Sequence, residues 1–382
     1  MTPAARISAA IEVLDRIAAG TPAEQALTNW GRARRFAGSG DRNAVRDLVY
    51  DALRCRRSYA ALGGAETGRG LMLGALRAAG TDPASLFTGE GHAPPPVAPA
   101  EQGRLPEGAE AIDLPDWLLP QLAESLGADL AAIAQALRQR APVFLRVNLR
   151  RTTVAQAIAA LEAEGIGAQP HDLADTALEV TTGARKIQTS AAYLSGLVEL
   201  QDAASQAVVT ALLLRDGMRV LDHCAGGGGK TLAMAARANL SLFAHDAFPA
   251  RMRDLTARAT RAGAKVALTE VPEALAPFDL ILADAPCSGS GSWRRDPQGK
   301  WALTPDRLAQ IGTVQDAILD RLASMVASGG VLAYATCSLL RVENEDRIAA
   351  FLGRMPGWRL LESRRFTPLT GGDGFFLAQL TH

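Results

Sequence analysis

Two cysteines follow apolar runs that could lie side by side in a sheet. Cys287 stands in "DAPCSGSG", just after the run "FDLILAD" that ends at Asp284, and Cys337 ends the run "VLAYATC". If these runs are neighbouring strands, about 4.8 Å apart, both thiols face one pocket. Burial as a small apolar side chain is the alternative for a free cysteine, and we expect it for Cys55.

Paired thiols suit methylation of a pyrimidine at its fifth carbon. That carbon is too weak a nucleophile to accept a methyl group until a thiolate has added to the sixth carbon. A cysteine with an ordinary pKa near 8.5 is only about 3% ionised at pH 7, so the site must lower that pKa or activate the thiol during attack. The proton on the fifth carbon must then leave, and the second cysteine could take it directly or through water.

A glycine run offers a place for the methyl donor. In "LDHCAGGGGKT" four glycines lead into a helix, and Cys224 occupies the position where a nucleoside triphosphate loop needs its first glycine. A glycine turn at a helix N-terminus favours a carboxylate, such as the amino-acid end of S-adenosylmethionine. Asp246, at the end of the next apolar run, could accept hydrogen bonds from ribose hydroxyls. A plain tight turn and a helix cap are the structural alternatives.

The elements that must position these residues alternate from about residue 205 onward. Segments with helical spacing separate short apolar runs, which are "RVLDHC", "SLFAHD", "KVALTE", "FDLILAD", "VLAYATC", "WRLLES" and "FFLAQL". This alternation predicts a doubly wound α/β domain over 205–382, with a mostly parallel, Rossmann-like sheet and a ligand beyond the carboxyl ends of its strands.

Three further segments precede this domain. Residues 1–88 have the apolar spacing of amphipathic helices, 89–112 form a linker rich in Pro, Gly and Ala, and 113–204 predict a helical connector and a small α+β subdomain. Residues 1–60 hold ten arginines and six acidic residues, with arginines clustered in "RARR" and "RCRR". The clusters predict a phosphate-binding surface, and a solvated helix face is the alternative.

Composition sets broad limits on the class of protein. The 382 residues are 48% hydrophobic, which predicts two or three globular domains. Forty basic and forty acidic residues cancel, so affinity for nucleic acid must come from local patches. The four cysteines form no C-x-x-C pair, so we expect free thiols and no metal site. No run of about 18 apolar residues occurs, so we expect a cytoplasmic protein without a membrane span.

Several of these motifs together resemble a known family. "LDHCAGGGGKT", "DAPCSGSG", "ATCSLLRVENED" and "DGFF", with "LRVNLRR" and "LQDAASQ" before them, are similar in kind and order to the motifs of the Sun/RsmB-type RNA cytosine-5 methyltransferases, from about residue 143 to the end. "DRNAVRDLVYDALRCRRS" resembles the NusB-like RNA-binding domain of bacterial members. The resemblance implies S-adenosylmethionine as cofactor and RNA as substrate, with small-subunit ribosomal RNA ahead of transfer RNA. A monomer would suffice.

The resemblance also implies roles for individual residues. Cys337 would be the nucleophile, Cys287 would assist release, and Asp284 would hold the cytosine's polar edge or the methionyl group of the donor. The residues implied in cofactor binding are Cys224, Ala225, Gly226, Gly227, Gly228, Gly229, Lys230, Asp246, Arg251 and Asp284, with Glu270 as the candidate near the adenine. The candidates for RNA contact are Arg34, Arg35, Arg56, Arg57, Arg146, Trp293, Arg294, Arg295 and Lys300.

The sequence departs from the family pattern at one place and leaves two alternatives open. Gly226 and Gly227 stand where the family usually has Ala-Pro, which predicts a looser turn. An amino-group methyltransferase is the second enzyme class, but such enzymes typically show an Asn/Asp-Pro-Pro-aromatic stretch where "DAPCS" stands. An RNA-binding assembly factor with a vestigial methyltransferase fold is the non-enzymatic alternative.

Overall fold

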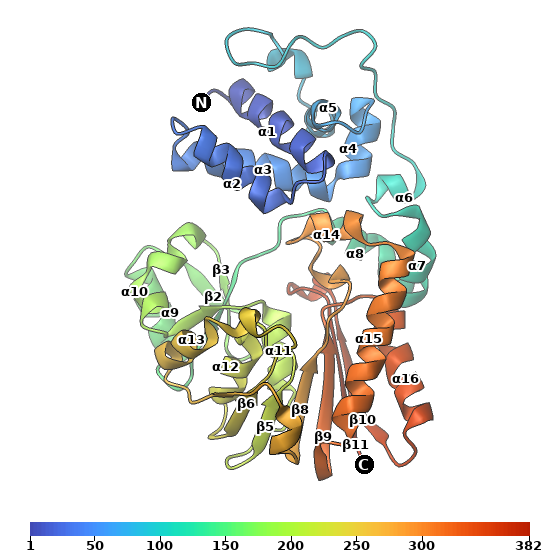
Figure 1. The fold of residues 1–382 in the computed structure, drawn as a ribbon. Coiled ribbons are helices and arrows are strands. Elements are labelled where there is room, and N and C mark those ends of the chain that lie inside the picture. The colour runs from blue at the N-terminus through green and yellow to red at the C-terminus, as the bar shows by residue number, and fades with distance from the viewer. The chain divides into compact units, whose positions relative to one another are not determined.

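The computed structural model describes residues 1–382 and divides into two compact units (Figure 1). The helical unit comprises Met1–Arg140 and Trp293–Leu303, and the α/β unit comprises Ala141–Ser292 and Thr304–His382. The chain therefore returns to the helical unit for a short segment after Cys287. The expected domain boundaries differ here, because 113–140 and 293–303 belong with the N-terminal helices.

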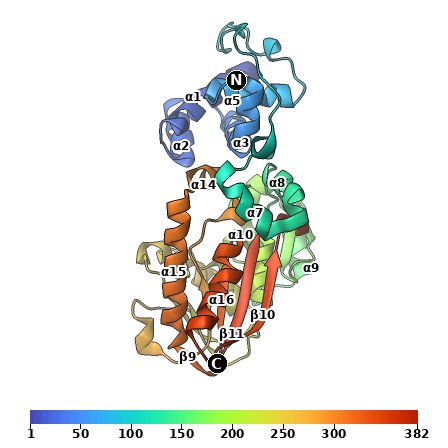
Figure 2. The same ribbon diagram turned by 90° about the vertical axis from the view of Figure 1, so that its right-hand side faces the viewer.

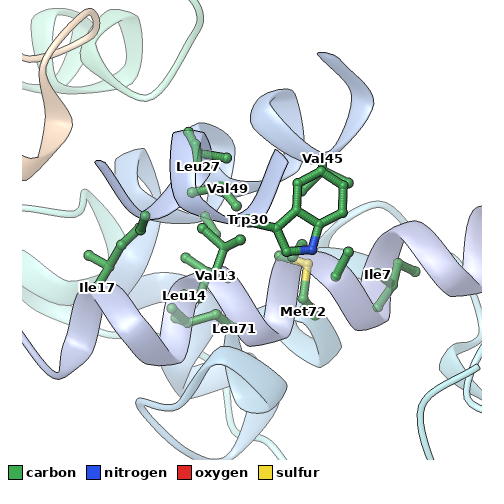
Figure 3. Packing of buried hydrophobic residues seen from close by; sticks show 14 of the residues in the cluster. Ile7, Val13, Leu14, Ile17, Leu27, Trp30, Val45, Val49, Leu71 and Met72 are labelled. Atoms are coloured by element: carbon green, nitrogen blue, oxygen red, sulfur yellow. The ribbon is translucent and has the colours of Figure 1, made fainter. Parts of the chain in front are cut away.

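The helical unit is built on five helices: α1 (Pro3–Ala18), α2 (Ala23–Ala33), α3 (Ser39–Arg54), α4 (Arg56–Gly63) and α5 (Gly68–Ala78). The first begins where the Thr2 hydroxyl accepts a hydrogen bond from the backbone N–H of Ala5 at 3.2 Å, with Pro3 in its first turn. Apolar side chains on the inner faces, including Val13, Trp30 and Met72, converge on one core (Figure 3). The predicted amphipathic spacing is therefore the spacing of a buried stripe.

Shorter elements complete the helical unit. They are η1 (Pro83–Ser85), α6 (Gly108–Ala111), η2 (Asp116–Leu118), α7 (Leu119–Leu126), η3 (Gly127–Asp129), α8 (Leu130–Leu137) and α14 (Pro297–Ala302). Helix α14 covers the C-terminus of α3: the Lys300 ammonium donates to the carbonyl of Arg54 at 3.0 Å, and the Trp301 indole N–H donates to the carbonyl of Leu53 at 2.6 Å. These side chains satisfy carbonyls that the last helical turn leaves without partners.

Within the α/β unit, a small antiparallel sheet comes first, with strand order β2-β3-β1-β4. Its strands are β1 (Phe144–Val147), β2 (Ala168–Pro170), β3 (Ala177–Val180) and β4 (Val198–Leu200). Three helical elements accompany it: α9 (Val154–Glu162), η4 (Ala184–Thr189) and α10 (Ala191–Leu194). Leu145, Leu161 and Leu178 share one buried cluster, which confirms that this segment folds as an α+β subdomain.

The large sheet has seven strands in the order β10-β11-β9-β8-β5-β6-β7. They are β5 (Arg219–Asp222), β6 (Ser241–Ala244), β7 (Ala267–Leu268), β8 (Phe278–Asp284), β9 (Val326–Thr336), β10 (Arg359–Phe366) and β11 (Phe375–Thr381). Strands β5 to β9 pair in parallel, and β10 and β11 are antiparallel at one edge. The expected doubly wound, mostly parallel sheet is confirmed.

Helices cover both faces of this sheet, which explains why its strands read as continuous apolar runs. On β8, Leu280 and Leu282 pack with α11 (Ala203–Thr210) and α12 (Gly229–Ala235), whereas Ile281 and Ala283 pack with α15 (Pro305–Ala323) and α16 (Glu345–Arg354). Helices α15 and α16 run beside the sheet in both views (Figures 1 and 2). The remaining elements are α13 (Leu255–Ala262), η5 (Pro249–Met252), η6 (Pro272–Leu275), η7 (Ser290–Ser292), η8 (Arg341–Glu343) and η9 (Pro368–Thr370).

The strand order reverses at β5, whose neighbours are β6 on one side and β8 on the other. Crossovers to the two sides leave a crevice at the carboxyl ends of the strands at this point, and ligands of doubly wound sheets bind there. No helix of the chain is both long and apolar enough to cross a membrane.

Candidate active site

A cavity of about 690 Å³ opens at the carboxyl ends of β5, β6, β8 and β9. It brings together most of the catalytic and cofactor-binding residues predicted from the sequence. Those lining it are Cys224, Ala225, Gly226, Gly227, Gly229, Lys230, Asp246, Arg251, Asp284, Cys287 and Cys337. Glu270 is exposed and does not line it, so this structure does not support Glu270 as the residue near the adenine.

The two cysteines lie side by side, as predicted from neighbouring strands. The Sγ atoms of Cys287 and Cys337 are 3.4 Å apart. Strands β8 and β9 pair in parallel with Asp284 opposite Ala335, and beyond them the N–H of Gly291 donates to the carbonyl of Cys337 at 2.9 Å. The thiols therefore come together because the backbone pairing continues past the strand ends.

The two thiols differ in their electrostatic surroundings. The hydrogen bond from Cys287 is the main cause that lowers the pKa of Cys337, and the nearby Lys230 ammonium acts in the same direction. The same hydrogen bond and burial raise the pKa of Cys287. Cys337 is thus the thiol that loses its proton more readily, and Cys287 is the donor.

Lys230 and Asp284 form an ion pair at the edge of this thiol pair. The ammonium lies 2.7 Å from a carboxylate oxygen of Asp284 and 4.8 Å from the ring centroid of Phe375. Burial disfavours the charged amine, but the carboxylate outweighs burial and raises the pKa of Lys230. Lys230 therefore stays protonated beside Cys337.

The glycine-rich loop is held by Asp246 and by close packing. The backbone N–H of Gly226 donates to one oxygen of Asp246 at 2.9 Å, and the N–H of Phe248 donates to the other at 2.9 Å. Gly228 has φ of 81°, and a Cβ there would lie 2.1 Å from a methyl carbon of Leu255. Glycine is required at that position both by its left-handed backbone and by the helix that packs on it.

Asp222 is a cavity residue that the sequence reasoning missed. Its carboxyl group is buried at the end of β5, accepts a hydrogen bond from Thr231 at 2.6 Å, and leaves Oδ1 without a partner. Burial raises its pKa to about 7. Its position in the sequence, at the end of a predicted strand and just before "HCAGGGG", is the signal that could have identified Asp222 as a site residue.

Arg146 requires a correction. The sequence analysis placed it at an RNA-binding surface, but its side chain is buried and donates to the carbonyl of Gly229 at 2.6 Å and to Gln201. Close by, the buried Glu199 pairs with Arg258 at 2.9 Å, and Arg258 donates to the carbonyl of Gly227. Arg146 and Glu199 of the α+β subdomain thus support the glycine-rich loop, the first directly and the second through Arg258.

Several other RNA candidates are also buried, within the helical unit. The side chains of Trp293 and Lys300 are each 1% exposed, and Arg294 is 5% exposed, so the expectation that they grip a nucleotide is corrected. Arg295 is exposed. Sequence alone gave no sign of this burial, because the partners of α14 lie about 250 positions earlier in the chain.

The arginines of the N-terminal helices are divided between solvent and ion pairs. Arg34 and Arg35 are exposed, with Arg34 3.3 Å from Glu12. Arg56 pairs with Glu66. Arg57 makes a bidentate contact with Asp116, with N–O distances of 3.0 and 2.8 Å. Arg34 and Arg35 are therefore the better candidates for phosphate contact.

The seven-stranded sheet, the loop at its switch point and the cavity define the class of protein: the fold is that of the S-adenosylmethionine-dependent methyltransferases. A family model described as 16S rRNA methyltransferase RsmB/F matches residues 209–381, and one described as the ferredoxin-like domain of RsmF/B-like methyltransferases matches residues 114–188. The chain belongs to the RsmB/F methyltransferase family.

Individual relatives agree with this assignment. Ribosomal RNA small subunit methyltransferase B of Citrobacter koseri is 33% identical over 282 residues, an alignment that spans 70% of this chain and 66% of the relative. A crystal structure of a methyltransferase homologue from Pyrococcus horikoshii is 25% identical, with a TM-score of 0.62 over 71% of this chain and 96% of that one. The crystal structure of PH0851 is 23% identical and matches all of this chain and 99% of its own, with a TM-score of 0.79.

Proposed function

We propose that this protein methylates carbon 5 of a cytosine in RNA, using S-adenosylmethionine and a transient covalent bond between Cys337 and carbon 6. The observation that carries the proposal is the pair of thiols 3.4 Å apart in the cavity that also contains the glycine-rich loop. An enzyme that methylates an amino group does not need a thiol pair, so this geometry favours a carbon target.

The cavity fits the proposed cofactor. Asp222 Oδ1 is buried without a hydrogen-bond partner, and it would accept from the amino group of the methionine part. The backbone of Gly226 and Gly227 would lie against the carboxylate, and Asp246 would face the ribose. Bound there, S-adenosylmethionine supplies an electrophilic methyl group.

Attack on the base would begin at Cys337. Its lowered pKa provides more thiolate, and the Lys230 ammonium stabilises that charge before the bond forms. Asp284, which Lys230 holds at 2.7 Å, would accept from the exocyclic amino group of the cytosine. The base would have to leave its stack to reach this cavity.

Release would depend on Cys287. After methylation the proton on the fifth carbon would pass to water, its bonding electrons would re-form the double bond, and the bond between Cys337 and carbon 6 would break to give the Cys337 thiolate. Cys287, whose raised pKa keeps its thiol protonated, donates a hydrogen bond to the departing sulfur, 3.4 Å away. The leaving thiolate is stabilised by this bond, which lowers the barrier to release.

We further propose that the substrate is small-subunit ribosomal RNA, with transfer RNA as the alternative. The description of the family model and the names of the relatives support this choice. The helical unit would contribute RNA binding in the manner of a NusB-like domain, chiefly through exposed arginines such as Arg34 and Arg35.

Two substitutions test the mechanism. Cys337→Ala should abolish methyl transfer, while Cys287→Ala should accumulate a covalent protein–RNA adduct that survives denaturing electrophoresis. Mass spectrometry of nucleosides should find 5-methylcytidine in RNA treated with the wild type. An N-methylated base as the product, or full activity in Cys337→Ala, would refute the proposal. Bisulfite mapping of ribosomal and transfer RNA distinguishes the two substrates.

A further inference from the structure

A buried carboxylate links the two cysteine-bearing loops. Glu343, the last residue of η8, is 0% exposed. One of its oxygens accepts from the backbone N–H of Ser288 at 2.7 Å and from the Gln315 amide at 3.4 Å. The other accepts from the hydroxyls of Ser288 and Ser338. The four hydrogen bonds satisfy the carboxylate without exposing it to water.

Each serine held by Glu343 directly follows one of the two cysteines. Ser288 comes after Cys287 and Ser338 comes after Cys337. A second layer joins the same loops: the Ser290 hydroxyl lies 3.1 Å from that of Ser338. Glu343 therefore bridges the two loops at the residues next to the sulfur atoms, which lie 3.4 Å apart.

A neutral amide could bridge the same groups only with two of these bonds reversed: its oxygen would accept from the Ser288 N–H and from Gln315, and its NH2 would donate to the two serine hydroxyls. The charge of Glu343 therefore requires a separate explanation. Its negative charge raises the pKa of both thiols. At Cys287 this effect follows the larger effects of the hydrogen bond with Cys337, of burial and of the Cys337 charge, and at Cys337 it follows those of the same hydrogen bond, of burial, of Asp284 and of Lys230. At Cys337 the Lys230 ammonium opposes this effect. At Cys287 the carboxylate adds to the effects that keep the proton in place.

Other charged or titratable groups also face the thiols. Lys230 on α12 and Asp284 on β8 act on Cys337, and Tyr334 on β9, whose hydroxyl donates to the carbonyl of Glu343 at 2.7 Å, interacts with Cys287. Around Tyr334 stand Arg347 on α16 and Asp316 on α15, 2.7 Å from one another. The last two groups form an ion pair and contribute opposite charges.

We propose that Glu343 is a positioning residue for the methyl-transfer reaction: its buried carboxylate holds the loops of Cys287 and Cys337 together and places a negative charge beside the two thiols. The inference rests on the proposed function, since it assigns the attacking role to Cys337. The two parts of this proposal can be tested separately. The bridge between the two loops depends on the hydrogen bonds of Glu343, whereas its electrostatic effect on the thiols depends on the negative charge of the carboxylate.

Glu343→Gln keeps the size of the side chain and removes its charge. Alkylation by iodoacetamide, followed at each cysteine by peptide mass spectrometry across pH 6 to 10, measures where each thiol ionises without requiring RNA. We expect the midpoint for Cys287 to fall by about one pH unit, which makes its alkylation near pH 8 about ten-fold faster than in the wild type. Glu343→Asp retains the charge, so the midpoint for Cys287 should fall less than in Glu343→Gln, while turnover falls because the shorter side chain cannot bridge both serines.

Glu345→Gln is the matched control. Glu345 lies two positions further on and pairs with Arg365 at 2.6 Å, so its loss should leave both alkylation midpoints unchanged. Equal midpoints for Cys287 in the wild type and in Glu343→Gln would overturn the inference. If Glu343→Gln does not fold, Ser338→Ala becomes the test: we expect a lower kcat with an unchanged KM for S-adenosylmethionine, because one anchor of the bridge is lost, and an unchanged kcat would overturn the inference. Failure of the proposed function differs from both outcomes, because the wild type itself would then make no 5-methylcytidine.

Discussion

Replacing Lys230 by methionine should separate electrostatics from packing at the thiol pair. Methionine has similar length and no charge, so the cavity keeps its shape while Cys337 loses its neighbouring cation. Loss of an adjacent opposite charge raises a thiol pKa by about one unit or more. At pH 7.5 the thiolate fraction, and with it kcat/KM, should fall by about ten-fold or more.

The sign of the pH effect follows from the protonation state that attacks. In the proposed mechanism the Cys337 thiolate attacks the base, so kcat/KM should rise with pH through the pKa of that thiol. Because Lys230 lowers this pKa, Lys230→Met should move the rising limb toward higher pH, and activity should recover in part above pH 9. Steady-state methylation with a labelled donor over pH 6 to 10 measures the shift.

Stability supplies the control for this substitution. Asp284 would lose its partner, and since its side chain is 30% exposed the cost should be about 2 kcal/mol, below the range for a fully buried pair. The double substitution of Lys230→Met with Asp284→Asn should regain most of that stability and none of the activity. An unshifted pH profile in Lys230→Met would refute the role given to the ammonium.

Three further outcomes are expected. Arg146→Met should raise the KM for S-adenosylmethionine several-fold with little change in the KM for RNA, because the arginine supports the glycine-rich loop; equal effects on both constants would contradict this. Stability should fall as pH rises from about 4 to about 7, because Asp222 must ionise while buried, and Asp222→Asn should remove that part of the pH dependence of Tm. Substituting Arg34 and Arg35 together by alanine should weaken RNA binding and reduce the slope of log K against log salt by up to about 2, whereas an unchanged slope would exclude phosphate contacts by this pair.

Local patterns in the sequence predicted the parts of the site that lie on strands. Seven apolar runs correspond to the seven strands of the sheet. The pattern is clearest for strands such as β8 and β11, which are buried on both faces and therefore need apolar residues on both. Their order placed Cys287 and Cys337 at neighbouring strand ends, and the glycine run placed the loop beside them. These predictions succeeded because each depends on a few adjacent residues and on a general rule of strand connection.

Predictions for single charged residues were less successful. Arg146 and Lys300 were both expected to contact RNA, yet one supports the glycine-rich loop and the other caps the C-terminus of α3. A charged residue has the same local signature whether its partner is a phosphate or a distant carbonyl. Burial decides between these outcomes, and burial depends on segments far away in the chain.

The amino-acid sequence by itself determined the class of fold, the neighbouring positions of the two thiols and the loop at the strand switch, since periodicity and motif order are properties of contiguous residues. Only the tertiary structure decided which thiol keeps the proton. That asymmetry depends first on the hydrogen bond between the two thiols and then on charges from other elements: Lys230 lowers the pKa of Cys337, and Glu343 raises that of Cys287. Electrostatic effects of this kind depend on distance in space, and distance along the chain does not predict them.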